Sequence, residues 1–449
     1  GEEYNRDGGV TVMLRYTLRL LTTQQRDRIT KMVLAAEMIR RQAYPQFGKE
    51  PISIGFWVGG GVTPNKFDEF IEKADHPQAA RSARNHVYKQ LLTCPFCGKP
   101  LKEENFNIDT DKKSIEIFCS DRDCQFYRYK NDRMPIPVYL VDEEICAKCP
   151  TIILSTVDKF ARLPWDVNTN ALFGRVDRKC SRDGYVAIGA EHGRHNKTAS
   201  LPASTMVNIR PFLPPELIIQ DELHLITGPL GTVYGAYETI IEDMCIHDGI
   251  KPKYVVSTAT IKNAEAQTRC LYARKYTTQF PPNGFEIGDS FFIREISVED
   301  DPFRKYVGIC APGQSVNAII LQAAYTYSLQ DEYKDVIDPY YSLVGYFNSI
   351  RELGGAVRLL QDDIPKRIYR IKNKYGLDKQ RYLNHNVEIT SRMSSYKIPE
   401  KLNQLETTCA SKDCLDTAIA TNMIAVGMDV DRLGLMVVTG QPKQNSEYI

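Results

Sequence analysis

Short apolar runs that end abruptly in polar residues recur along this chain of 449 residues. The runs Val10–Leu14, Ile52–Val58 and Leu217–Ile219 have the length and the composition of buried parallel strands. After the first run, apolar residues at helical spacing predict an amphipathic helix; they are Ile29, Met32, Val33, Ala36 and Ile39. Strands that alternate with helices predict an α/β fold with a mostly parallel sheet.

The length and the pattern together predict two domains, because 449 residues are too many for one hydrophobic core. A linker-like stretch at residues 280–285 separates the halves, so we expect a first domain at residues 1–285 and a second at residues 286–449. Two further strands are predicted in the first domain, one beginning at Thr151 and one at Lys253. In the second domain the predicted strands are Val307–Cys310, Ser342–Phe347, Val387–Thr390, Thr417–Ala420 and Leu435–Thr439.

Composition and charge narrow the class of protein. A hydrophobic content of 43% with 25% charged residues is typical of a soluble globular protein, and no apolar run is long enough to span a membrane. The 57 basic and 56 acidic residues nearly cancel, so any binding of nucleic acid depends on local patches. The twelve cysteines, several in close pairs, indicate reduced thiols and a metal site rather than disulfides.

The main candidate for chemistry is the acidic pair Asp221 and Glu222, which follows the apolar run Leu217–Ile219 and precedes His224. Open α/β sheets bind ligands at the carboxyl ends of their strands. In P-loop NTPases an Asp at such a place holds Mg²⁺, and a neighbouring acid orients the attacking water. A strand that simply ends at the surface with two solvated acids accounts for the pair equally well when it is taken alone.

The cysteine spacing predicts a structural zinc site. Cys94 and Cys97 form one Cys-x-x-Cys turn, and Cys119 and Cys124 form a second turn after 21 intervening residues. This spacing is close to that of a zinc ribbon, in which four thiolates close a tetrahedral site, and we place the ribbon at about residues 88–130. Four unrelated core thiols are the alternative.

Cys146 and Cys149 form another Cys-x-x-Cys pair that has no obvious second half. Cys180, His192 or His195 could complete it, but the spacings are irregular. We therefore expect these residues to be structural rather than metal-binding.

Six segments, in order along the chain, resemble the motifs of superfamily 2 DExH-box helicases. Arg15–Leu20 resembles motif Ia, Gly59–Gly60 the glycine doublet, Ser155–Phe160 motif Ib, Asp221–His224 the DExH box, Ser257–Thr260 motif III and Ala420–Asp429 motif V. The segments Gln220–Thr232, Val344–Ala356 and Ala420–Lys443 are most similar to the helicases of the bacterial DISARM anti-phage defence system.

This resemblance implies two RecA-like lobes with mostly parallel sheets, the zinc ribbon being inserted in the first lobe, and ATP and Mg²⁺ as cofactors. It implies that Asp221 holds Mg²⁺, that Glu222 orients the attacking water, and that His224 couples to Ser257 and Thr260. Gly427 and Asp429 would complete the nucleotide cleft from the second lobe. The residues implied to contact DNA phosphates are Arg15, Thr17, Arg19, Thr156, Lys159 and Thr421.

The resemblance also implies an ATP-dependent DNA helicase or translocase in the bacterial cytoplasm, with single-stranded or end-bearing DNA bound with weak sequence preference. A DrmB-like companion protein and the DISARM DNA methyltransferase are the implied partners. Partner contacts or a DNA-blocking element are expected in the insertions at residues 70–150 and 166–210, which could alternatively only cap the first lobe.

Two family features are missing from these residues: the Walker A lysine and the arginine finger of motif VI. We therefore expect the chain to be an internal fragment of a larger protein and to turn over little ATP alone. The rival hypothesis is a zinc-ribbon nucleic-acid-binding scaffold with ATPase-inactive RecA lobes. The adjacent acids Asp221 and Glu222 argue against it, since a scaffold has no need of them.

Overall fold

The structure is a computed structural model in which the chain forms two compact units, Gly1–Ile261 and Lys262–Ile449. It describes residues 8–16, 22–58, 63–71, 77–130, 134–198, 201–226, 228–258, 264–282, 284–286, 288–300, 304–308, 336–376, 380–390, 393, 401, 404–421, 430 and 432–440. The division between the units lies before the one that the sequence suggested at residue 285. Among the described helices, none combines the length and the apolar character that a membrane crossing requires.

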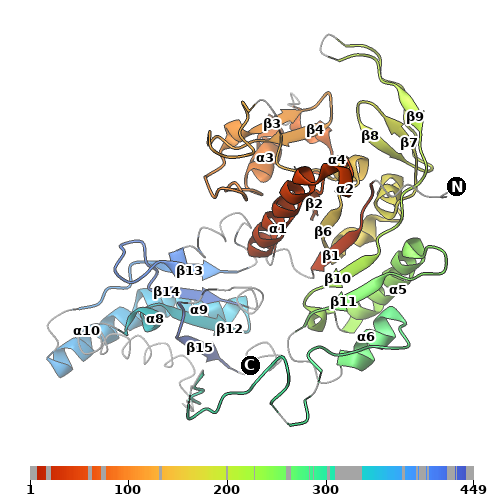
Figure 1. Ribbon diagram of the computed structural model, residues 1–449. Coiled ribbons are helices and arrows are strands. Elements are labelled where there is room, and N and C mark those ends of the chain that lie inside the picture. Colours follow the sequence, from red (N-terminus) through yellow and green to blue (C-terminus); the bar gives the residue numbers. More distant parts are fainter. Residues whose placement is uncertain are drawn as a thin grey trace. The chain divides into compact units, whose positions relative to one another are not determined.

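The first unit is built on a six-stranded sheet in the order β11-β10-β1-β6-β2-β5, in which every neighbouring pair is parallel (Figure 1). The strands are β1 (Val12–Tyr16), β2 (Ile54–Trp57), β5 (Val138–Tyr139), β6 (Ile152–Thr156), β10 (Leu217–Gln220) and β11 (Lys253–Val256). The strand that ends at the acidic pair is therefore paired on both sides, with β1 and β11.

Five of the described helices belong to the first unit: α1 (Thr22–Gln42), α2 (Tyr44–Phe47), α3 (Pro77–Tyr88), α4 (Asp142–Lys148) and α5 (Gly228–Cys245). Helix α6 (Ala264–Tyr272) belongs to the second unit. A 3₁₀ helix, η3 (Val157–Arg162), follows β6. A second one, η4 (Val167–Phe173), comes soon after it.

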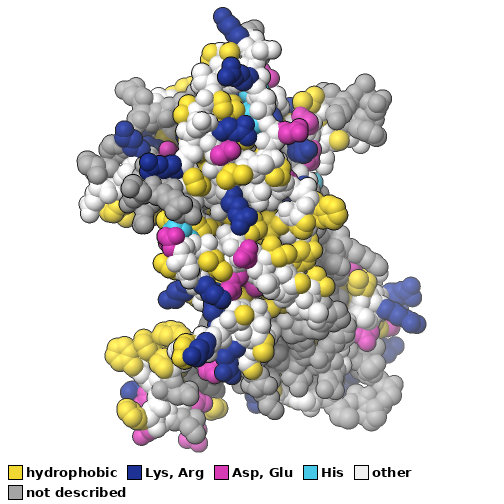
Figure 2. All heavy atoms as spheres, turned by 90° about the vertical axis from the view of Figure 1, so that its right-hand side faces the viewer, with side chains coloured by type: hydrophobic (Ala, Val, Ile, Leu, Met, Phe, Trp, Pro, Cys, Tyr) yellow, Lys and Arg dark blue, Asp and Glu magenta, His cyan; other side chains and the backbone are white. Residues whose placement is uncertain are grey.

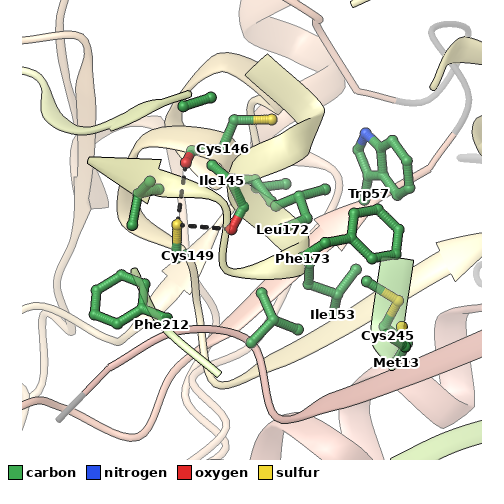
Figure 3. Packing of buried hydrophobic residues seen from close by; sticks show 14 of the residues in the cluster. Met13, Trp57, Ile145, Cys146, Cys149, Ile153, Leu172, Phe173, Phe212 and Cys245 are labelled. Atoms are coloured by element: carbon green, nitrogen blue, oxygen red, sulfur yellow. Dashed lines mark hydrogen bonds between the residues drawn. The ribbon is translucent and has the colours of Figure 1, made fainter. Parts of the chain in front are cut away.

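One apolar core holds the sheet and its covering segments together (Figure 3). Met13, Ile153 and Ile218 contribute from three adjacent strands, and each is fully buried. Leu172 and Phe173 pack on them from η4. Burial of side chains of this size contributes about 1.5–3 kcal/mol each, so this cluster is a main source of the unit's stability.

The zinc-ribbon region forms its own small subdomain. Its antiparallel hairpin consists of β3 (Phe106–Asp109) and β4 (Ser114–Ile117), and it lies beside α3 in Figure 1. The buried rings of Phe118 and Phe126 supply part of its core. This hairpin lies within residues 88–130, where the sequence predicts the inserted ribbon.

Residues 166–210, the second of the expected insertions, contain an antiparallel sheet in the order β8-β7-β9. Its strands are β7 (Val176–Cys180), β8 (Gly184–Ala187) and β9 (Met206–Asn208). Val176 and Val186 from this sheet, and Phe212 just after it, are buried in the main core. The short strands escaped sequence analysis because polar and charged residues interrupt them, as in β7, where only Val176 and Cys180 are buried.

The second unit contains a four-stranded parallel sheet in the order β13-β14-β12-β15. Its strands are β12 (Leu343–Phe347), β13 (Asn386–Ile389), β14 (Thr417–Ala420) and β15 (Met436–Thr439), and its helices are α8 (Asp338–Tyr341), α9 (Ile350–Gln361) and α10 (Asp363–Tyr375). Ser349 caps α9 by accepting a hydrogen bond from the backbone of Glu352.

Two parallel α/β sheets with an inserted cysteine ribbon confirm the fold class that the sequence predicted. The strand predicted at Val307–Cys310 is not present at residues 307 and 308, which the structure describes without regular structure. Residues 309 and 310 lie outside the described residues.

Candidate functional site

The acidic pair lies where three parallel strands end together. The backbone N–H of Asp221 donates to the carbonyl of Arg15 at 3.0 Å, so the β1–β10 ladder continues to this residue. On the other side, the N–H of Ser257, just after β11, donates to the carbonyl of Gln220 at 2.8 Å. The predicted position of Asp221 and Glu222 at the carboxyl edge of a parallel sheet is therefore what the structure shows.

The carboxylate of Asp221 is held by two hydrogen bonds to one of its oxygens. Ser257 donates from Oγ to Asp221 Oδ1 at 2.5 Å, and the backbone N–H of Glu222 donates to the same oxygen at 2.9 Å. Charge-assisted bonds of this kind fix the orientation of a carboxylate. Ser257 thus bonds to Asp221, whereas the resemblance to helicase motifs implied that it couples to His224.

Glu222 adopts a left-handed backbone conformation, with φ 53° and ψ 47°. A residue with a Cβ pays roughly 1–2 kcal/mol for this conformation, so the surrounding contacts must maintain it. The turn places Glu222 Oε2 3.2 Å from Nδ1 of His224, which is almost fully buried. Thr258 Oγ1 lies 3.4 Å from the same nitrogen.

Thr258 is a site residue that sequence reasoning missed. Thr260, the residue expected to couple to His224, lies outside the described residues. The signal was present in the sequence, since Thr258 is the hydroxyl residue that directly follows Ser257, but the spacing alone did not show which hydroxyl faces the histidine.

Burial raises the pKa of Glu222, the negative charge of Asp221 raises it further, and His224 opposes both effects. Burial also raises the pKa of the Tyr16 hydroxyl, and the negative charge of Asp221 raises it further. Tyr16 is therefore a neutral phenol close to the acidic pair. A carboxylate whose pKa is raised toward neutral pH is a better general base than an ordinary surface acid.

Arg15, expected to contact DNA phosphates, is instead fully buried. Its Nη1 donates to Glu238 Oε2 at 2.7 Å, and its guanidinium lies 5.6 Å from the ring centre of Phe160. Tyr254 donates from its hydroxyl to Glu238 Oε1 at 2.6 Å. This network ties β1 to α5 and β11, so Arg15 helps to join the two strands that flank β10.

Lys159 and Thr156, two more of the expected DNA contacts, are also buried. Lys159 Nζ lies 2.5 Å from Asp142 Oδ2 and 3.1 Å from Asn65 Oδ1, and Arg162 shares the same Asp142 oxygen at 3.0 Å. Thr156 is the last residue of β6, and Lys159 follows that strand. Other residues of the protein surround both side chains.

The remaining expected residues are placed only in part. Thr421 follows β14 and is half-buried. Thr17, Arg19, Gly59, Gly60, Gly427 and Asp429 lie outside the described residues. On the described parts of the face in Figure 2, Lys and Arg side chains lie in separate small groups among acidic and apolar side chains, without one broad basic patch.

The four ribbon cysteines come together as predicted. The sulfurs of Cys94 and Cys124 are 3.8 Å apart, those of Cys97 and Cys119 are 3.5 Å apart, and all four lie within 4.8 Å of one another. This donor set fits a tetrahedral zinc ion, which thiolates bind with all four positions closed. The cluster can therefore hold a structural zinc.

Cys146 and Cys149 do not join a metal cluster among the described residues. Both are buried in the main core, where the Cys149 thiol donates to the carbonyls of Cys146 and Ala171 (Figure 3). Burial raises the pKa of Cys149 to about 12, so this thiol stays protonated. Both side chains are thus part of the packed core.

Comparison with known proteins gives one close relative in sequence. The chain is 52% identical over 464 aligned residues to the DISARM protein DrmA of Bacillus paralicheniformis (strain ATCC 9945a / NCIMB 11709 / CD-2). The match covers 99% of this chain and 40% of that protein, so the chain spans about two fifths of its relative. No family model matches the chain.

Solved structures of helicases resemble the chain more distantly. The DUF1998 helicase MrfA bound to DNA and AMPPNP is 13% identical with a TM-score of 0.40, over 98% of this chain and 43% of that chain. The DEAD-box helicase Mss116 bound to ssRNA and UDP-BeF is 11% identical with a TM-score of 0.44, over 98% and 56%. At these TM-scores neither structure determines the fold or the function of this chain.

Proposed function

We propose, with the similarity to DrmA as the premise, that this chain is part of an ATP-dependent DNA helicase or translocase of a bacterial DISARM defence complex. The observation that carries the ATPase activity is the pair Asp221 and Glu222 at the carboxyl edge of the sheet, with Asp221 oriented by Ser257. The defence context rests on the 52% sequence identity.

In this proposal Asp221 holds the Mg²⁺ of bound ATP, because carboxylate oxygens are ligands that Mg²⁺ prefers. When bound, the ion neutralises charge that develops on the phosphate oxygens. The bond from Ser257 keeps the Asp221 carboxylate in place, which removes the cost of orienting it during the reaction. Gly427 and Asp429 remain proposed residues of the same cleft.

Glu222 orients the attacking water and accepts its proton. Its raised pKa suits this role, because a general base works best when its pKa is near the operating pH. His224 links Glu222 to Thr258 at the end of β11. A shift of that strand end would therefore move the histidine, and with it the catalytic carboxylate.

DNA binding is proposed from the resemblance, through phosphate contacts that carry no sequence information. Arg19, Thr17 and Thr421 remain proposed contacts. Arg15, Thr156 and Lys159 are excluded from this set, since their side chains are buried in the structure. The zinc of the cysteine ribbon is proposed as structural, and a DrmB-like protein and the DISARM methyltransferase as partners in the bacterial cytoplasm.

The experiment is ATP hydrolysis by the full-length protein that contains this chain, with and without DNA. Asp221→Asn should abolish Mg²⁺-dependent hydrolysis. The control is Glu216→Gln, which removes an exposed carboxylate just before the same strand, β10, and should leave hydrolysis unchanged. An ATPase-inactive scaffold predicts no hydrolysis in the unmodified protein, and that result would overturn the proposal.

A further inference from the structure

We propose that Cys180, Asp183, His192 and His195 bind a second zinc ion, separate from the cysteine ribbon, although their spacing in the sequence favoured a structural role. The first two residues stand at the ends of the turn between β7 and β8. The two histidines belong to the extended segment that follows β8. The site thus joins two parts of the β7–β9 subdomain that no strand pairing connects among the described residues.

The four possible ligand atoms already converge. Nε2 of His192 lies 3.0 Å from Asp183 Oδ2, and Nε2 of His195 lies 2.8 Å from the same oxygen. With the sulfur of Cys180, these atoms all lie within 4.8 Å of one another. Zinc bonds of about 2.0–2.3 Å in a tetrahedron require ligand atoms about 3.3–3.8 Å apart, so only small side-chain shifts are needed.

Hydrogen bonds within the protein do not satisfy this cluster. Asp183 Oδ1 and His192 Nδ1 are both buried without a hydrogen-bond partner among the described residues. Cys180 is 1% exposed, and Asp183 and His192 are 12% and 16% exposed. A buried polar group without a partner is unfavourable, which points to a further bound species in the cluster.

The backbone around Cys180 resembles that of the ribbon. The N–H of Arg182 donates to Cys180 Sγ at 3.5 Å, and in the ribbon the N–H of Asp121 donates to Cys119 Sγ at 3.4 Å. In both turns the donor lies two residues after the cysteine. Each bond fixes the position of the sulfur within its turn.

The loops that carry the ligands are fixed by bonds of their own. Arg182 donates from its guanidinium to the carbonyls of Asn196 and Pro202. His195 and Ser204 exchange two hydrogen bonds, since each backbone N–H donates to the other residue. A preorganised ligand set of this kind lowers the cost of binding an ion.

Gly184 allows the turn to approach helix α4. Its φ is +116°, and a Cβ at this position would lie 2.3 Å from the carbonyl oxygen of Ala147. Only glycine fits there, so the position of Asp183 beside the histidines depends on its neighbour.

The ligand types select zinc among the common metals. Mg²⁺ and Ca²⁺ require mostly oxygen ligands, and iron–sulfur clusters are held by cysteine thiolates. One thiolate, two imidazoles and one carboxylate form a borderline set that suits Zn²⁺. Four protein ligands close the coordination shell, so the ion clamps the subdomain and does not catalyse a reaction.

The test is the zinc content of the purified full-length protein, measured by elemental analysis. The unmodified protein should contain about two zinc ions per chain from these two sites. Cys97→Ser and His195→Gln should each remove about one, and the double variant should contain none from either site. The control is His247→Gln, because His247 also lies beside a carboxylate, that of Asp248 at 3.1 Å, but belongs to no metal-ligating group among the described residues.

A further variant separates loss of metal from loss of folding. Asp183→Cys would give the two-cysteine, two-histidine set that zinc binds in many proteins, so it should keep the second ion against a chelator better than the unmodified protein. One zinc in the unmodified protein that Cys97→Ser removes entirely would overturn the proposal. So would two zinc ions that persist in His195→Gln.

Discussion

Arg15 and Glu238 form a buried ion pair, with Nη1 of the arginine 2.7 Å from Oε2 of the glutamate. The two side chains are 0% and 1% exposed. The arginine stands in the segment that resembles motif Ia, so the sequence suggested a DNA contact. The structure makes it a connection between β1 and α5 instead.

Arg15→Ala should lower the free energy of unfolding by about 3–5 kcal/mol, because it leaves Glu238 charged and buried without its partner. Chemical denaturation measures this change. Arg81→Ala, at an exposed arginine of α3, is the control and should have little effect. The double variant Arg15→Met with Glu238→Leu should recover most of the loss, and a single-variant cost below about 1 kcal/mol would contradict the buried pair.

Lys159 and Arg19 should differ in their effect on DNA binding. Arg19→Ala should weaken binding to all sequences alike and reduce the slope of log affinity against log salt by about one unit. Lys159→Met should leave that slope unchanged and lower the melting temperature, since Lys159 pairs with Asp142 inside the protein. A reduced slope in Lys159→Met would show that the lysine reaches DNA.

Glu144 should make stability depend on pH. It is fully buried in α4, and burial raises its pKa to about 8, although it accepts a hydrogen bond from the backbone of Ile115. The folded protein therefore holds a proton here that the unfolded chain releases above about pH 4.5. Stability falls by at most about 1.4 kcal/mol for each pH unit between there and pH 8.

Glu144→Gln lacks this contribution. The melting temperature of the variant minus that of the unmodified protein should rise from pH 5 to pH 8. Glu103→Gln, at an exposed glutamate of the ribbon region, should show a constant difference over the same range. Parallel profiles for Glu144→Gln and the unmodified protein would mean that Glu144 is ionised when buried.

Loss of zinc from the ribbon should unfold it locally. Cys97→Ser removes one of four clustered sulfurs, and folding of such small sites depends on the metal. Hydrogen exchange should speed up at Cys119, whose N–H donates to the carbonyl of Phe126, while amides of β10 stay protected. Equal protection of Cys119 in both proteins would show that the ribbon folds without its metal.

The sequence predicted the strands well because their signal is local. The apolar runs around Met13, Ile153 and Ile218 became the strands β1, β6 and β10, with ends shifted by two residues or fewer. The cysteine turns were equally readable, since two Cys-x-x-Cys-like pairs at that distance are characteristic of a zinc ribbon.

The partners of polar residues were not readable in the same way. Lys159 is neutralised by Asp142, and Arg15 by Glu238, which lies 223 residues away. Nothing in the local pattern distinguishes a buried cation from one that faces DNA. Asp183 was missed as a candidate metal ligand for a related reason. The pairs Cys180-x-x-Asp183 and His192-x-x-His195 have matching spacing. An aspartate is nevertheless a less distinctive sign of a zinc site than the four ribbon cysteines.

The contribution of residues 166–210 to the main core was also not readable from the sequence. Its polar surface residues hid the apolar positions Phe173, Val176 and Val186, which fill the main core. Deletion of this segment would therefore destabilise the first unit, and single-site variants such as His195→Gln are the better probes of it.

The most direct test of the account is Glu222→Gln in the full-length protein, with ATP hydrolysis and Mg-nucleotide binding measured on the same sample. Glu222 lies beside Asp221 and His224 with a raised pKa, as a water-orienting base requires. We expect hydrolysis to fall by about 10²-fold or more, with nucleotide affinity retained. Unchanged turnover in the purified variant would contradict the account and remove Glu222 from the mechanism.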